Sequence, residues 1–126
     1  GLWNDTQEAG LRRIVDFVHG QSSALIGLQL GHSGPKGSTQ VGWEIGDEPL
    51  PADGPHANWP LLAASAVAYG AQNQTPAAMT RADMEQMRDA FVASTRRAMA
   101  AGFDSLNVSV KAGIIDYKID RQSIER

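Results

Sequence analysis

A side-chain amide and an imidazole lie close together in the segment ALIGLQLGHSGPKGS, at Gln29 and His32. The segment begins as a continuous apolar run and ends in a glycine-rich turn, which predicts a strand followed by a loop. A glutamine amide offers a hydrogen-bond donor and an acceptor together. In barrels of parallel strands, ligand sites lie where the carboxyl ends of the strands meet the following loops. We therefore expect a ligand site around Gln29 and His32.

The composition argues against several kinds of site and partner. The chain has 126 residues, 42% hydrophobic and 20% charged, which is typical of one soluble globular domain. It has no cysteine for disulfides, thiolate metal sites or a thiol nucleophile, and His19 and His56 lack metal-ligand spacing. The net charge of −3 gives no basic field for nucleic acid, and no apolar run reaches the roughly 18 residues of a membrane span. We expect no metal, nucleic-acid or membrane partner, and a cytoplasmic location.

Two helices are predicted to hold the strands. The first covers residues 4–20, with Asn4 as its cap, Gln7 completing a capping box and Gly20 ending it. Its apolar stripe consists of Leu11, Ile14, Val15 and Val18. The second covers residues 81–101 between the capping pair Thr80 and Asp83 and a terminal glycine, Gly102. Its core face is predicted to consist of Met84, Met87, Phe91 and Ala98.

The two predicted strands are residues 24–30 and 104–110, and residues 31–79 between them form a long loop. The first strand is apolar apart from Gln29, which is typical of a strand covered on both faces. Two strands joined through a helix predict a right-handed βαβ crossover and an α/β fold. We therefore expect the strands to be parallel and adjacent, with the helix of residues 81–101 packed across them.

Four segments resemble, in the same order, the old yellow enzyme family of FMN-dependent oxidoreductases, which are TIM barrels. They are LWNDTQEAGLRRIVDFVH, QLGHSG, PAAMT and AMAAGFDSLNV, and together they lie within residues 2–108. The resemblance implies a partial TIM barrel, running from helix 2 to strand 4, with a long loop after the first strand present. It divides the chain into a barrel segment, 1–108, and a divergent tail, 109–126.

The resemblance also implies a function. The family transfers a hydride from NAD(P)H through FMN to an activated C=C bond, as in an enone. The loop GWEIGDEPLP is further similar to the oxidoreductase half of bifunctional aminobenzoyl- and salicylyl-CoA monooxygenase/reductases, which implies an aryl-CoA-type substrate. The family position of Gln29 binds the pyrimidine edge of the flavin; the alternative is that Gln29 satisfies local backbone groups.

Other loop residues have two interpretations each. His32 either has a functional role, in which it orders the site loop or touches cofactor or substrate, or it holds the turn by bonding a backbone carbonyl. Trp43 and Trp59 either line a substrate mouth or pack the long loop.

The chain departs from the family pattern at three places. Pro35 replaces an arginine, and Ser109 and Ala112 stand where the family has the two residues that grip the substrate carbonyl. The chain also matches only part of a barrel, which needs about 200 residues or more. We therefore expect this chain alone to be inactive. The alternative function is a non-catalytic remnant, or an α/β fragment that associates with itself through bare strand edges.

Overall fold

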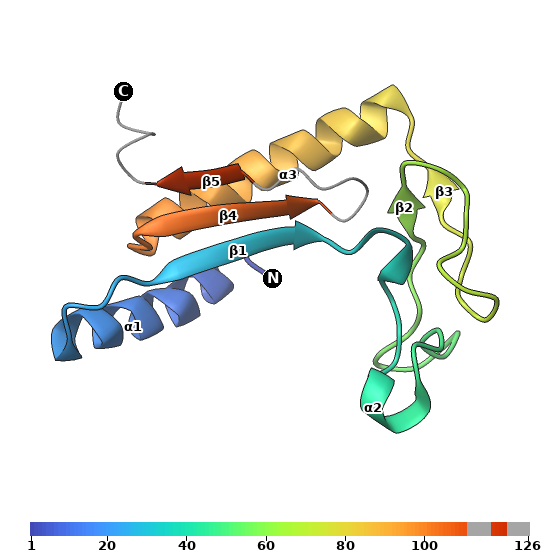
Figure 1. Ribbon diagram of the computed structural model, residues 1–126, viewed down its shortest axis with the longest axis horizontal. Helices are drawn as coiled ribbons and strands as arrows, with labels where there is room; N and C mark the ends of the chain where they lie inside the picture. The colour runs from blue at the N-terminus through green and yellow to red at the C-terminus, as the bar shows by residue number, and fades with distance from the viewer. Residues whose placement is uncertain (111–116, 121–126) are drawn as a thin grey trace. The chain divides into compact units, whose positions relative to one another are not determined.

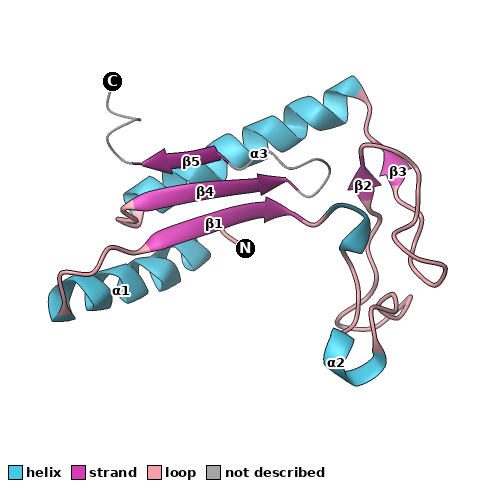
Figure 2. Ribbon diagram, viewed as in Figure 1, coloured by secondary structure: helices cyan, strands magenta, loops and turns pink. Residues whose placement is uncertain are grey.

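The computed structural model describes residues 1–110 and 117–120, and it divides into two compact units. The first unit contains Gly1–Gly31 and Met84–Val110, and the second contains His32–Asp83. Figure 1 follows the chain through both units, and Figure 2 marks the helices and strands.

A three-stranded sheet forms the centre of the first unit. Its order is β1 (Gly27–His32), β4 (Ser105–Val110) and β5 (Tyr117–Asp120). β1 and β4 run in the same direction in Figure 1, whereas β5 is antiparallel to β4. The predicted adjacent and parallel pair is thus confirmed. β5 was not expected, because the tail has no clear hydrophobic period. The observed fold is mixed α/β. The partial barrel stays a prediction.

Two helices cover one face of this sheet. α1 (Asp5–Gln21) and α3 (Arg81–Ala100) share a core cluster with β1 and β4. Its buried members are Leu2, Val15, Leu30, Ala98, Ala101, Phe103 and Leu106. The prediction that the first strand is covered on both faces is wrong, because both helices pack on the same side and only Leu28 and Leu30 of β1 reach the core.

The first strand also lies later in the chain than predicted. Its pairing with the second strand starts where the Asp104 N–H donates to the Ile26 carbonyl at 3.0 Å, and β1 continues to His32. Gln29 therefore lies inside the strand rather than at its end, and His32 is the last strand residue.

Asn4 caps the start of α1 as predicted, but Gln7 bonds the residue before the cap and does not complete the predicted capping box, and the predicted end of the helix is wrong. Asn4 Oδ1 accepts from the Gln7 N–H at 2.9 Å, and Gln7 Oε1 accepts from the Trp3 N–H at 2.8 Å. The helix does not stop at Gly20. It continues to Gln21, and Ser22 ends it because its N–H and its hydroxyl both donate to the Val18 carbonyl at 3.0 Å.

α3 begins at the predicted residue and ends at Ala100, one residue earlier than predicted. Asp83 Oδ2 accepts from the Thr80 N–H and hydroxyl, and Thr80 Oγ1 accepts from the Asp83 N–H, which forms a capping box. Gly102 has a φ of 91°, and it ends the helix in a Schellman motif. The predicted core face is wrong at Met84, which lies in the first turn and is 48% exposed, whereas Phe91 and Ala98 pack against the sheet.

The second unit consists mainly of loops that are tied together by hydrogen bonds. Its short elements are η1 (Gly34–Lys36), α2 (Gly42–Ile45) and the parallel pair β2 (Leu62–Ala63) and β3 (Ala77–Ala78). Ser38 is buried, and its hydroxyl donates to Asn58 Oδ1 and accepts from the Trp59 N–H. The long predicted loop therefore has a defined structure with little regular secondary structure.

Candidate functional site

The face of the sheet that points away from the helices carries small and polar residues. Side chains alternate between the two faces of a strand, so the neighbours of Leu28, Leu30, Leu106 and Val108 lie on the opposite face. These neighbours are Gly27, Gln29 and Gly31 on β1, and Ser105, Asn107 and Ser109 on β4. A recess of about 360 Å³ lies here, lined by Gly27, Leu28, Gln29, Ser105, Leu106 and Asn107.

Two glycines fix which residues face each other across the strands. A Cβ atom at Gly27 would lie 2.5 Å from Ser105 Oγ, and a Cβ atom at Gly31 would lie 3.5 Å from the Ser109 carbonyl oxygen. Gln29 and Asn107 are the residues midway between these two pairs of neighbours. Gln29 and Asn107 are therefore neighbours on adjacent strands, with their side chains on the same face of the sheet.

Neither amide is satisfied by the described part of the chain. The Gln29 side chain is exposed and forms no hydrogen bond with another described residue. Asn107 Oδ1 is buried and has no hydrogen-bond partner there. The residues that line the recess carry no charge. The lining of the recess thus includes two neutral amides, of which Asn107 Oδ1 is buried, and one hydroxyl, from Ser105.

His32 is half-buried and belongs to the second unit. Burial lowers the pKa of its imidazole below the ordinary value of 6.5, because desolvation disfavours the charged form. Its ring forms no hydrogen bond with the described residues; the following turn is held by backbone bonds from Lys36 to Ser33 and from Gly37 to Gly34. Pro35 is the second residue of η1, where its fixed φ suits the first helical turn.

The remaining predicted residues lie in different places. Ser109 is on the face of β4 that carries Asn107, whereas Ala112 lies outside the described residues. Trp43, on α2, is 86% exposed, and Trp59 is 50% exposed. Trp43 therefore does not pack the loop.

His19, which had no predicted role, pairs with an aspartate at the start of the sheet. His19 Nε2 lies 2.7 Å from Asp104 Oδ2, which also accepts from the Ile26 N–H at 2.9 Å, so this pair joins the end of α1 to the start of the sheet. Asn107 lines the recess and was not among the predicted site residues. Its sequence signal is the alternation of polar residues, Ser105, Asn107 and Ser109, along an otherwise apolar strand.

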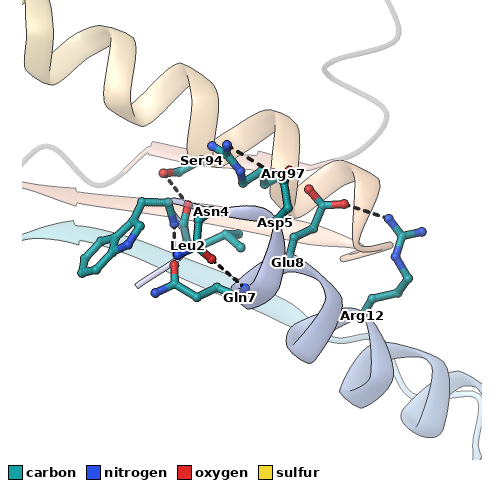
Figure 3. A network of polar contacts seen from close by, with 9 residues as sticks. Leu2, Asn4, Asp5, Gln7, Glu8, Arg12, Ser94 and Arg97 are labelled. Carbon is teal, nitrogen blue, oxygen red and sulfur yellow. Dashed lines mark hydrogen bonds and ion pairs between the residues drawn. The ribbon is translucent and has the colours of Figure 1, made fainter.

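A second, larger groove of about 560 Å³ lies on the helical side of β1. Its wall is mainly apolar and includes Leu28, Met87 and Phe91 together with the N-terminal residues Leu2 and Trp3. Figure 3 shows how the N-terminal segment is held: the Ser94 hydroxyl donates to the Leu2 carbonyl at 2.9 Å. Arg97 approaches Asp5 at 3.6 Å, and Asp5 is almost fully exposed, so this ion pair contributes little.

Metal and membrane sites are not found in the described part of the chain. Residues 1–110 and 117–120 contain no cluster of histidine, aspartate and glutamate side chains that could hold a metal ion. Within the same ranges, no helix has both the length and the apolar character to cross a bilayer.

The family model and the similar proteins indicate the same family. Residues 1–115 match the model of the NADH:flavin oxidoreductase / NADH oxidase family. An NADH:flavin oxidoreductase of Gibberella zeae is 38% identical, and the match covers 91% of this chain and 28% of the relative. An NADPH dehydrogenase of a Geobacillus species is 34% identical, covering 86% of this chain and 26% of the relative. An NADPH dehydrogenase of Listeria welshimeri is 30% identical, and the match covers 94% of this chain and 29% of the relative. The chain thus spans less than a third of these relatives.

Proposed function

Because the chain belongs to the NADH:flavin oxidoreductase / NADH oxidase family, we propose that it forms part of the flavin site of an old yellow enzyme-type oxidoreductase. FMN, when bound, takes a hydride from NAD(P)H and passes it to an activated C=C bond. The observation that carries this proposal is the Gln29 amide, which has no partner among the described residues and borders the recess between β1 and β4.

The recess suits the ring of FMN. The pyrimidine edge of the flavin presents donors and acceptors in alternation, and an amide matches such an edge because it offers both. The residues of the recess are uncharged, as suits a neutral heteroaromatic ring. They include no cation that could neutralise a phosphate, so the phosphate of FMN would have to be held by other residues.

This chain offers fewer hydrogen-bond donors to a substrate carbonyl than the family pattern does. We propose an enone or an aryl-CoA-type acceptor as the substrate, with Ser109 and Ala112 at the two positions that face its carbonyl. A serine hydroxyl can donate one hydrogen bond, and alanine can donate none. His32 would help to order the loop that follows β1, as a residue whose lowered pKa keeps it uncharged at neutral pH.

The proposal is tested by titrating the chain with FMN and following flavin fluorescence. Gln29→Leu should weaken binding roughly fivefold, which corresponds to about 1 kcal/mol for one lost hydrogen bond. The matched control is Gln72→Leu, an exposed glutamine in the second unit, which should leave the Kd unchanged. An unchanged Kd in Gln29→Leu would contradict the flavin role of Gln29.

A second candidate function is that of a fragment that associates with itself. β1 is an edge strand of the sheet that the structure describes, and it contains no proline, lysine or acidic residue that would discourage strand pairing. We propose that copies of the chain pair along this edge. Sedimentation velocity should then show a mass that rises with concentration, and a single monomeric species at all concentrations would exclude it.

A further inference from the structure

We propose that Asn107 is a second ligand-binding amide of the recess, and that it binds the planar polar edge of the ligand beside Gln29. This inference rests on the flavin role proposed for Gln29 and extends the site from β1 to β4. Nothing in the family resemblance assigns a role to Asn107.

The first argument is the unpaired oxygen of Asn107. Buried polar atoms in native proteins almost always have a hydrogen-bond partner, so an exception needs a cause. Asn107 Oδ1 is buried without one in the described part of the chain, although the other face of the same strand carries Leu106 and Val108. An apolar residue would remove the unsatisfied group. Local rules of this kind are broken mainly at functional sites.

The second argument is the position of Asn107 next to Gln29. The neighbouring pairs Gly27–Ser105 and Gly31–Ser109 set the two amides side by side on adjacent strands. Adjacent strands are about 4.8 Å apart, so the two amides can meet neighbouring groups on one planar ring. Gly27 and Gly31, which flank Gln29, have no side-chain atoms to project from this face of the sheet. At Gly27 any larger residue would collide with Ser105 Oγ, because even a Cβ atom would lie 2.5 Å from it.

The chemistry of the recess defines the class of ligand. Two amides and a hydroxyl can donate to ring carbonyls and accept from a ring N–H, and none of the lining residues supplies a charge. The ligand is therefore a neutral heteroaromatic ring with an imide-like edge.

The first test uses the unmodified chain and proton–nitrogen NMR, with FMN as the probe. FMN should shift the side-chain NH₂ signals of Asn107 and Gln29 together. Ribose 5-phosphate, which lacks the ring, should shift neither. If FMN shifts the Gln29 signal and not that of Asn107, this inference fails and the role of Gln29 stands. If it shifts neither, both proposals fail.

The second test compares Asn107→Leu with the control Gln72→Leu. Asn107→Leu should weaken FMN binding roughly fivefold, the effect of one lost hydrogen bond, while its midpoint of urea unfolding stays the same or rises. Gln72→Leu should change neither quantity. A purely structural role predicts the reverse for Asn107→Leu, namely a lower unfolding midpoint with an unchanged Kd, and that result would overturn the inference.

Discussion

At the scale of single residues, the two faces of β4 obey different rules. Leu106 and Val108 pack into the core, whereas Asn107 between them holds a buried oxygen without a partner among the described residues. Leaving such a group unsatisfied costs about 1–3 kcal/mol. A ligand N–H that reached this amide would recover part of that cost, which favours binding over a purely structural role.

His32 should titrate at a lower pH when the chain is folded. Burial lowers its folded pKa below 6.5, so the unfolded chain binds more protons between the two pKa values. The stability linked to His32 is therefore fully present above about pH 6.5, and it is lost as the pH falls through the folded pKa. NMR titration of the imidazole in the folded chain and in urea measures both values; a folded pKa at or above the urea value would contradict this.

Val15 and Ile14 are neighbours in α1 with opposite environments. Val15 is 0% exposed in the core, and Ile14 is 53% exposed. Val15→Ala should lower the free energy of unfolding by about 1.5–3 kcal/mol, because it leaves a cavity. Ile14→Ala, the matched control, should change it by less than about 0.5 kcal/mol. Urea unfolding followed by circular dichroism measures both, and equal effects would show that the α1 packing is wrong.

At the scale of the elements, capping hydrogen bonds determine where the helices begin and end. The Thr80–Asp83 box begins α3, and its hydrogen bonds, first that from the Thr80 hydroxyl, lower the pKa of Asp83. A carboxylate with a depressed folded pKa stabilises the fold above its unfolded pKa, and this contribution is lost as the pH falls through the folded value.

Asp83→Asn should therefore reduce the pH dependence of stability on the acid side. Asparagine keeps the side-chain shape but never ionises, so the variant should lose less stability than the parent between neutral and acidic pH. Asp53→Asn, in an exposed loop of the second unit, is the control and should follow the parent curve. Unfolding midpoints over a pH series would settle this, and identical slopes for Asp83→Asn and the parent would refute it.

Two glycines should respond to alanine in opposite directions. Gly102 has a φ of 91°, and a Cβ atom there would lie 3.3 Å from Val15 Cγ1, so Gly102→Ala should cost about 1–2 kcal/mol. Gly10 lies inside α1 with open space where its Cβ would be, so Gly10→Ala should stabilise by about 0.5–1 kcal/mol. Thermal unfolding measures both, and a stabilised Gly102→Ala would contradict the left-handed helix end.

At the scale of the whole molecule, the chain carries the recess beside Gln29 and spans only a fraction of its relatives' length. It spans 26–29% of the three relatives compared above, and the recess supplies no cation for a phosphate. We expect weak FMN binding and no measurable NADPH-dependent reduction of cyclohexenone by this chain alone. Micromolar binding in a fluorescence titration, together with turnover, would contradict this expectation.

Much of the fold could be predicted from the sequence because it depends on short-range chemistry. The caps at Asn4, Thr80 and Gly102 lie within a few residues of the groups they satisfy, so their sequence patterns are sufficient. The parallel pairing of β1 and β4 followed from two apolar runs separated by an amphipathic helix. Gln29 became a candidate site residue because the segment around it resembles a known motif.

Contacts between distant residues were decided only by the tertiary structure. Whether Met84 is buried depends on where α3 meets the sheet, and β5 was found only through its pairing with β4, because no hydrophobic period marks it. Asn107 became a candidate only when β1 was placed beside β4, since its unpaired oxygen and its neighbour Gln29 are properties of that pairing. A sequence pattern records which face of an element is apolar, whereas only the assembled strands show which polar groups remain without a partner.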